Sequence, residues 1–228
     1  MRTLGLIGGT SWHSTVVYYR LINELVAEEL GTSGNPPMVI HSLNIELMRR
    51  GNRSEIQKRY LEVGQDLNRS GAEAIIICAN TPHLVYPYLR DKISIPILHI
   101  ADATAQEANR LGIKHLGLIG NKPTMTGDSI RPHLLDRHDI STIIPDNFAI
   151  DRAHYFVSNE LTQGRFTEEA KAFFLEQIEN LTARGAEGII LGCTELPMLL
   201  DSINFSGNLL PTTSLHAKLA ADFIINNN

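Results

Sequence analysis

The chain alternates between short apolar runs and longer segments in which apolar residues recur every three or four positions. Short runs bounded by glycine or polar residues predict buried strands, and the wider spacing predicts helices that bury one face. The predicted strands of the first half are TLGLIGG (3–9), PMVIHS (37–42), AEAIIIC (72–78) and IPILHI (95–100). The predicted helices are 14–30, capped by Ser14, and 54–71, ending at Gly71. This alternation indicates an α/β fold built on parallel sheets.

The second half repeats the pattern of the first. LGLIGG from Leu4 returns as LGLIGN from Leu116, and GAEAIII from Gly71 returns as GAEGIIL from Gly185. A helix predicted over 167–185, capped by Thr167, matches the helix over 54–71. Such repeats can arise by chance in α/β proteins, but three at a nearly constant offset favour a duplication. We therefore expect two halves whose strand ends flank one cleft, because parallel sheets bind ligands beyond the carboxyl ends of their strands.

Two equivalent loops, CANTPH (78–83) and GCTELP (192–197), follow the repeated strands. In register, Cys193 of the second loop matches Ala79 of the first. A cysteine between a buried strand and a helix start lies where backbone N–H groups and the helix dipole favour an anion, which predicts a lowered thiol pKa. Such a thiol can act as an acid, a base or a nucleophile, although a lone cysteine is often only a small core residue. Cys78 is expected to point to the opposite face of its strand.

Composition narrows the possible classes of protein. The 228 residues are 43% hydrophobic and carry a formal net charge of −5, so we expect no nucleic-acid partner. No apolar run approaches the ~20 residues of a membrane span, and the N-terminus lacks a signal peptide. We therefore expect a cytoplasmic protein without a membrane partner. The two cysteines exclude a disulfide framework.

Motifs for cofactors and metals are missing from the sequence. GLIGG is not the G-x-G-x-x-G of a dinucleotide site. The nine histidines include no H-E-x-x-H, and no paired cysteine spacing accompanies them. We therefore expect neither a bound cofactor nor a metal.

Six sequence words point to a known family. They are GLIGGTSWHSTVVYYRLIN, GAEAIIICANTPH, LHIADAT, GLIGNKPTM, ELTQGRF and GAEGIILGCTELP. In this order they resemble the aspartate/glutamate racemase family over essentially the whole chain. SW followed by YY, together with HIADAT, resembles its bacterial aspartate/glutamate-specific subgroup.

The resemblance implies an architecture of two pseudo-symmetric flavodoxin-like halves, each a parallel sheet flanked by helices, with a cleft between them. It implies an N-terminal half of residues 1–98 plus 210–228 and a C-terminal half of residues 99–209. It also implies a homodimer that works without a cofactor.

The family reaction is racemisation of an acidic amino acid by two cysteines, one removing the α-proton and the other returning a proton on the opposite face. Carried over residue by residue, Cys193 occupies the position of the second cysteine and is the predicted acid/base. The resemblance places substrate-binding side chains at Thr10, Ser11, Arg49, Asn80, Thr81, Thr124 and Thr194. Arg50 and Arg53 lie near enough to Arg49 to compete for the side-chain carboxylate of the substrate.

Ala79 departs from the family pattern. The family word is usually Cys-Asn-Thr, and here it is Ala79-Asn80-Thr81, which offers no proton at its first position. Three outcomes follow. In the first, water or Thr81 takes the place of the missing cysteine on that face of the substrate, and the protein is a slow or one-sided racemase. Alternatively, Cys193 alone serves a single-cysteine decarboxylase or isomerase of a dicarboxylate, or the protein binds an acidic amino acid without turning it over.

Overall fold

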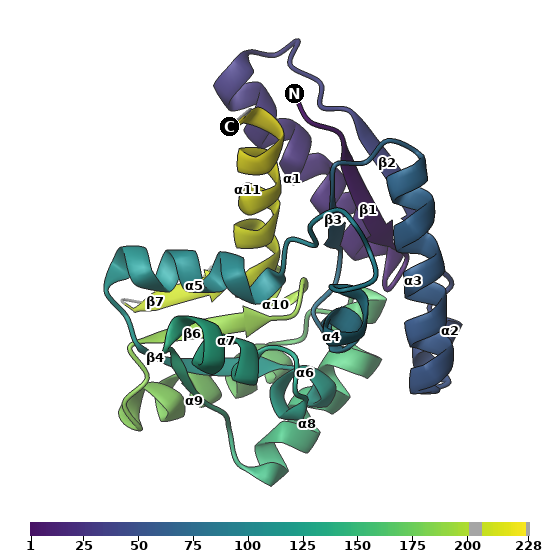
Figure 1. Ribbon diagram of the computed structural model, residues 1–228. Coiled ribbons are helices and arrows are strands. Elements are labelled where there is room, and N and C mark those ends of the chain that lie inside the picture. Colours follow the sequence, from purple (N-terminus) through teal and green to yellow (C-terminus); the bar gives the residue numbers. More distant parts are fainter. Residues whose placement is uncertain (201–206, 227–228) are drawn as a thin grey trace. The chain divides into compact units, whose positions relative to one another are not determined.

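The computed structural model describes residues 1–200 and 207–226 (Figure 1). The chain divides into two compact units, Met1–Ile100 with Thr213–Asn228, and Ala101–Thr212. Each unit holds one parallel sheet with helices packed on it. The predicted α/β class, with two parallel sheets flanked by helices, is confirmed.

The first unit is built on the sheet β2-β1-β3, in which every described pairing is parallel. Its strands are β1 (Leu4–Gly8), β2 (Met38–Ser42) and β3 (Ala74–Ile77). Its helices are α1 (Trp12–Leu30), α2 (Glu46–Arg49), α3 (Arg53–Arg69), η1 (Thr81–Val85), α4 (Tyr86–Leu89) and α11 (Thr212–Ile225). The last helix comes from the C-terminus, so this unit is assembled from both ends of the chain.

Alternation along the strands sorts the core of this unit into two layers. Ile75 and Ile77 pack with α3, whereas Ala74, Ile76 and Cys78 pack on the other face with α1 and α11. Both layers consist of buried, mainly aliphatic side chains, and each large one contributes about 1.5–3 kcal/mol of transfer free energy. Cys78 therefore points to the α1–α11 face of the sheet.

Two predicted elements of the first unit begin or end elsewhere. The first helix starts at Trp12 with Ser11 as its N-cap, because the Ser11 hydroxyl accepts the backbone N–H of Ser14. Ser14 is thus inside the first turn and is not the cap. The predicted strand 95–100 makes only a single parallel bridge, between Ile97 and Ile75. The Ile75 N–H donates to the Pro96 carbonyl and the Leu98 N–H donates to the Ile75 carbonyl, and helix α5 (Ile100–Leu111) begins two residues later.

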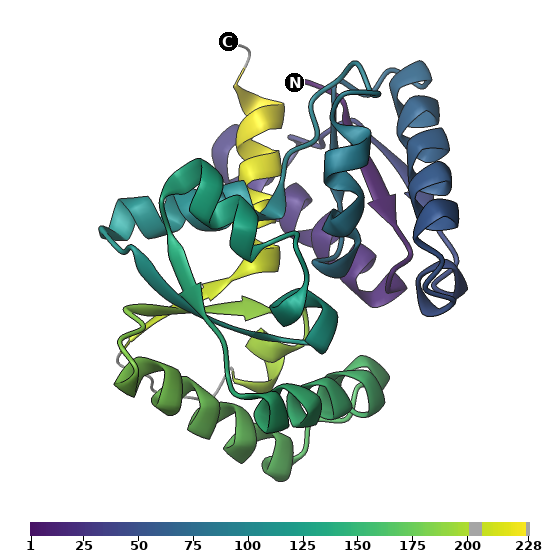
Figure 2. The ribbon, with the colours of Figure 1, turned by 60° about the horizontal axis from the view of Figure 1, so that its bottom comes forward.

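The second unit is built on the sheet β5-β4-β6-β7, again with parallel pairings. Its strands are β4 (His115–Gly120), β5 (Ser141–Ile143), β6 (Gly188–Gly192) and β7 (Asn208–Pro211). Its helices are α5 (Ile100–Leu111), α6 (Lys122–Thr126), α7 (Arg131–His138), α8 (Asn147–Asn159), η2 (Leu161–Gln163), α9 (Glu168–Ala183) and α10 (Leu196–Leu199). Figure 2 shows α8 and α9 along one face of this sheet and α5 and α7 along the other.

The two sheets share one strand order. In each, the first strand of the unit lies between the second and the third, and the second sheet adds β7 beyond its third strand, β6. Thr167 caps α9 through a hydrogen bond from Ala170 N, as its sequence position predicted. The common order is what duplication of an ancestral half would produce.

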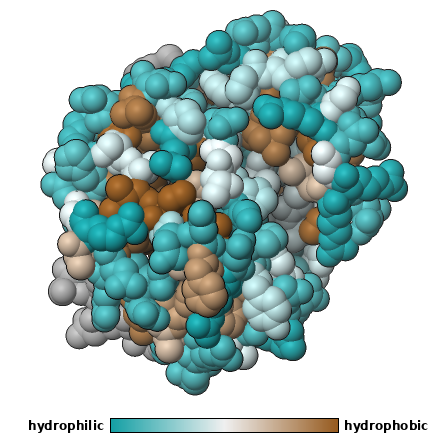
Figure 3. Space-filling model, turned by 90° about the horizontal axis from the view of Figure 1, so that it is seen from below, coloured by the Kyte–Doolittle hydropathy of each residue, from teal (hydrophilic) through white to brown (hydrophobic). Residues whose placement is uncertain are grey.

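Most of the exterior seen in Figure 3 is hydrophilic, with smaller hydrophobic patches between the polar side chains. Among the described residues, no helix combines the length and the hydrophobicity that crossing a bilayer requires.

Candidate active site

In the first unit, two candidate loops follow the carboxyl ends of neighbouring parallel strands. Strands β1 and β3 are parallel neighbours in which Ile7 lies opposite Ile77. The segment holding Thr10 and Ser11 follows β1, and the segment holding Asn80 and Thr81 follows β3. Neighbouring parallel strands end on one side, so the structure brings these predicted binding residues to a common edge, where α/β sheets bind ligands.

Glycine is required at the end of β1. Gly9 has φ +88°, and a Cβ at this position would lie 1.9 Å from the Leu43 carbonyl oxygen. The backbone N–H of Gly9 donates to the Thr15 hydroxyl at 2.9 Å, and that of Leu43 donates to the Gly8 carbonyl at 2.9 Å. These contacts fix the loop that carries Thr10.

The hydroxyls of Thr10 and Ser11 are both held by the surrounding fold. Thr10 Oγ1 lies 3.1 Å from the hydroxyl of Tyr60, which α3 contributes from the buried core. Burial raises the pKa of Tyr60, so its phenol stays neutral and can hydrogen-bond to Thr10. Ser11 uses its oxygen to cap α1. Both residues are partly exposed, so their hydroxyl groups can still reach a ligand.

A buried histidine holds the loop after β3. His83 Nε2 accepts the backbone N–H of Ile100 at 3.3 Å, so its Nδ1 carries the proton and donates to the Ala79 carbonyl at 2.9 Å. His83 therefore shapes the backbone of this loop. The side chain of Ala79 itself is a partly exposed methyl group, and Asn80 next to it is buried.

Cys78 belongs to the core. It is 1% exposed and lies in the hydrophobic layer with Tyr18. Burial raises the pKa of the Cys78 thiol well above its usual range. A neutral thiol inside an apolar layer has a packing role.

In the second unit, the equivalent edge brings Thr124 next to the cysteine loop. Gly120 and Gly192, the last residues of β4 and β6, lie opposite each other. A Cβ at Gly120 would lie 2.9 Å from the Gly192 carbonyl oxygen, so the two strand ends approach closely because both residues are glycines. A Cβ at Gly192 would lie 3.1 Å from Thr124 Cγ2. Thr124 thus packs beside the residue that precedes Cys193.

The thiol of Cys193 has a carboxylate as its partner. Cys193 is 9% exposed, and its Sγ donates to Glu195 Oε2 at 2.9 Å. Glu195 is itself buried, with 7% of its surface exposed. A buried thiol in hydrogen-bond contact with a carboxylate has its proton acceptor already in place. Thr194, the residue between them, is partly exposed.

The predicted lowering of the Cys193 pKa is wrong. Burial, the negative charge of Glu195 and the hydrogen bond to Glu195 together raise the pKa of this thiol well above its usual value. Backbone N–H groups of Glu195 and Leu196 act in the opposite direction but are outweighed. The helix that follows, α10, has only four residues, so it offers a weak dipole. The resting form of Cys193 is therefore the neutral thiol.

Glu195 is the site residue that sequence reasoning missed. Its signal was present, because Glu195 stands two residues after Cys193 in GCTELP. The loop between β6 and α10 folds back tightly enough for the two side chains to meet.

The predicted arginines lie on the surface of the first unit. Arg49, at the end of α2, forms an ion pair with Glu46 at 2.8 Å, and both side chains are about half exposed. Arg50 pairs with Glu55 at 3.7 Å. Arg53 begins α3 and is exposed. Exposed pairs of this kind contribute only about 0–1 kcal/mol, so a ligand carboxylate can displace them.

A surface pocket of about 440 Å³ lies beside Arg50. It is lined by Ser42, Leu43, Asn44, Glu46, Leu47, Arg50, Glu55, Lys58, Arg59 and Glu62. Arg50, one of the two competitors of Arg49, is therefore the predicted arginine that contributes to this pocket.

Comparison with known proteins identifies the family. Residues 7–220 match the model of the family described as Asp/Glu/hydantoin racemase. The crystal structure of a putative Asp/Glu racemase from Yersinia pestis is similar, with 34% identity, a TM-score of 0.93, and coverage of 99% of this chain and 100% of that one. PH1733, an aspartate racemase homologue from Pyrococcus horikoshii OT3, shows 29% identity and a TM-score of 0.87, with coverage of 99% of this chain and 100% of that one.

Two curated relatives agree with this assignment. The broad specificity amino-acid racemase RacX of Bacillus subtilis is 23% identical over 220 residues, which cover 94% of this chain and 95% of RacX. A glutamate racemase of Exiguobacterium sibiricum is 28% identical over 151 residues, which cover 65% of this chain; the chain spans about half (54%) of that relative's length. These matches support an isomerase of the amino-acid racemase class and confirm the resemblance that the sequence words predicted. The chain belongs to the Asp/Glu/hydantoin racemase family.

Proposed function

We propose that the protein is a cofactor-independent racemase of acidic amino acids in which Cys193 is the acid/base at the α-carbon. The observation that carries this proposal is the 2.9 Å hydrogen bond from the Cys193 thiol to the Glu195 carboxylate. A thiol whose proton has a built-in acceptor can cycle between acid and base. Membership of the racemase family supports the same reaction class.

The chemistry follows from the raised pKa of Cys193. As a base, Cys193 first passes its proton to Glu195, and the thiolate then takes the α-proton while the C–H electron pair moves onto the substrate carbon and its carboxylate. As an acid, in turnover of the opposite enantiomer, the thiol donates its proton to the carbanion and Glu195 returns to its charged form. Inversion also needs a proton transfer on the other face of the carbon, where we propose that water or Thr81 replaces the cysteine that is absent at Ala79. Burial and the Glu195 charge make forming the thiolate costly, but the thiolate that forms is a stronger base toward a weakly acidic C–H bond.

We propose that polar side chains on the strand-end loops bind the substrate. Their hydroxyl and amide groups suit the α-carboxylate and the amino group; they are Thr10, Ser11, Asn80, Thr81, Thr124 and Thr194. For the side-chain carboxylate we propose Arg49, and Arg50 as its alternative because Arg50 lines the surface pocket.

Ala79 supports a second candidate function. A methyl group at this position supplies no proton, and a positioned general acid is worth about 10²–10⁴ in rate, or ~3–5 kcal/mol of barrier. Cys193 would then serve one face of the substrate, as in a one-sided racemase or in a decarboxylase or isomerase of a dicarboxylate. Release of carbon dioxide from a panel of malonates would select decarboxylation. An optically changed amino acid without carbon dioxide would select racemisation.

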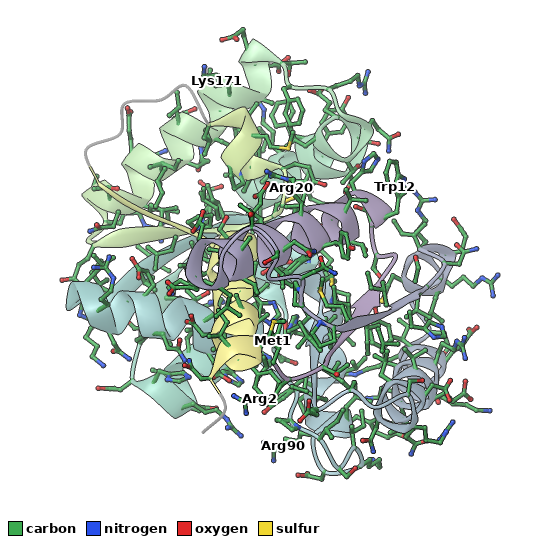
Figure 4. The ribbon with its side chains drawn as sticks, turned by 90° about the horizontal axis from the view of Figure 1, so that it is seen from above. Met1, Arg2, Trp12, Arg20, Arg90 and Lys171 are labelled. Atoms are coloured by element: carbon green, nitrogen blue, oxygen red, sulfur yellow. The ribbon has the colours of Figure 1, made fainter. Side chains whose placement is uncertain are left out.

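We further propose a cytoplasmic homodimer. Trp12, Val16 and Tyr19 are 62%, 55% and 46% exposed and lie on one face of α1 at helical spacing, which is an apolar stripe suited to a second copy of the chain. Trp12 and Arg20 project from α1 in Figure 4. Light scattering on size-exclusion eluate tests this. A dimer that Val16→Glu converts to monomer supports the assignment, and a wild-type monomer contradicts it.

Chiral analysis tests the activity itself. Purified protein is incubated separately with L-aspartate, D-aspartate, L-glutamate and D-glutamate, and the enantiomers are separated. We expect at least one substrate to lose optical purity with wild type and with the control Cys78→Ala. We expect the rate to fall by about 10²-fold or more in Cys193→Ser. Four optically unchanged substrates at high enzyme concentration would contradict the proposal.

A further inference from the structure

Three side chains of the second unit that take no part in the proposed reaction lie close together. His133 and His138 lie five residues apart on α7, and Asp102 lies in the first turn of α5. Asp102 Oδ1 is 2.6 Å from His133 Nε2 and 2.7 Å from His138 Nε2. The Nε2 atoms of both imidazoles thus face a single carboxylate oxygen, Asp102 Oδ1. Helices α5 and α7 lie over the same face of the sheet (Figure 2).

The donor set is that of a borderline divalent cation. One ligand atom from each of the three residues lies within 4.8 Å of the others. Zn²⁺ binds histidine nitrogen at ~2.0–2.1 Å and carboxylate oxygen at ~2.0–2.2 Å, and tetrahedral bonds of this length place neighbouring ligand atoms roughly 3.3 Å apart. One ion contacts all three residues once each imidazole nitrogen moves roughly 0.6–0.7 Å further from the Asp102 oxygen. Two histidines and one carboxylate with water in the fourth position is an established zinc coordination pattern.

The exposure of these three side chains is also compatible with a metal site that opens to solvent. The side chain of His133 is 7% exposed and is fixed, whereas those of His138 and Asp102 are 24% and 31% exposed. An ion can therefore enter from solvent and keep a water ligand.

We propose that Asp102, His133 and His138 form a binding site for Zn²⁺ or a closely related divalent cation, which joins α5 to α7. The Nε2 protons of the two imidazoles move to Nδ1 or to solvent, and the ion replaces the two hydrogen bonds to Asp102 by three coordination bonds. It thereby crosslinks two helices on one face of the second sheet. The site has a structural role and takes no part in the proton transfer at Cys193. Its test is therefore independent of the proposed racemase activity.

Metal titration of tag-free protein tests the site. The full chain is treated with a chelator and dialysed, and Zn²⁺ or Co²⁺ is added while binding is followed by calorimetry, metal analysis and the visible spectrum of Co²⁺. The variants are His138→Gln, at the more exposed ligand, and Asp102→Asn. The control is His154→Gln, since His154 lies on α8 and its ring hydrogen-bonds to Ser158, one turn further along the same helix.

We expect one metal per chain, a thermal midpoint that rises with Zn²⁺ in wild type and His154→Gln, and affinity weakened at least ~10-fold in both ligand variants. Circular dichroism establishes that each variant is folded before its affinity is compared. Absence of stoichiometric binding by folded wild type would overturn the proposal. So would unchanged affinity in His138→Gln, or a cobalt–thiolate absorption band that disappears in Cys193→Ser.

Discussion

Replacing Glu195 by glutamine removes the proton acceptor of Cys193 and almost nothing else. The amide has the size of the carboxylate and keeps an oxygen for the thiol, so the 2.9 Å contact can persist. A hydrogen bond to a charged acceptor contributes about 1.5–3 kcal/mol and a neutral one about 0.5–1.5 kcal/mol, so the folded state loses only about 1 kcal/mol. The loss of a positioned base is larger, about 10²–10⁴ in rate, or ~3–5 kcal/mol of barrier.

The same substitution should lower the pKa of the Cys193 thiol even though it slows the reaction. The charge of Glu195 helps to raise the pKa of Cys193, so the pKa should fall in Glu195→Gln. The variant therefore carries more thiolate at mildly alkaline pH and yet exchanges the α-proton more slowly. Thiolate is followed by its ultraviolet absorbance against pH, with Cys193→Ser as the baseline, and exchange is followed by NMR in D₂O.

Glu179→Gln, at an exposed position on α9, is the matched control and should change neither quantity. The reasoning would be refuted if Glu195→Gln exchanged at the wild-type rate. A thiol pKa that rose in this variant would refute the electrostatic part of the argument.

Three further predictions concern other parts of the chain. Ala79→Cys supplies a proton donor after β3 and should raise the racemisation rate measured by chiral separation; an unchanged rate would show that this position does not face the reacting carbon. Gly9→Ala should lower the free energy of unfolding in urea by about 3 kcal/mol or more, because strain at φ +88° adds to the clash with Leu43. Gly71→Ala has the same φ with open space, so it should cost only about 1–2 kcal/mol; equal costs would refute the clash. Burial raises the pKa of Cys78, so its contribution to stability is present below the unfolded pKa of about 8.5 and is lost as pH rises above it. Cys78→Ala should therefore lose less unfolding free energy than wild type between neutral and alkaline pH, and an equal loss would contradict this assignment.

Local periodicity was enough to predict the fold class. Buried parallel strands are continuously apolar, so runs such as 74–77 and 188–192 stand out without any tertiary information. The boundary errors have physical causes. Ser11 and Ser14 are chemically equivalent as caps, and only the backbone turn after Gly9 decides between them. The run 95–100 is apolar, yet it makes a single bridge, and its last residue, Ile100, already belongs to α5.

The candidate site was predicted less completely, because contacts across a loop or between helices leave no periodic signal. The sequence placed Cys193 at a strand end but gave no measure of its burial, which reverses the predicted direction of its pKa. Sequence spacing likewise gave no sign of the Asp102–His133–His138 cluster. Its residues come from two helices, and their approach depends on how these helices pack.

The central claim is that the sulfur of Cys193 exchanges the α-proton of an acidic amino acid. Its most direct test is deuterium incorporation at the α-carbon of aspartate and glutamate in D₂O, followed by NMR for wild type and for folded Cys193→Ser. The account predicts exchange of at least one enantiomer by wild type, and a loss of about 10²-fold or more in the variant. Equal exchange by the two proteins, or none by wild type at high concentration, would contradict it.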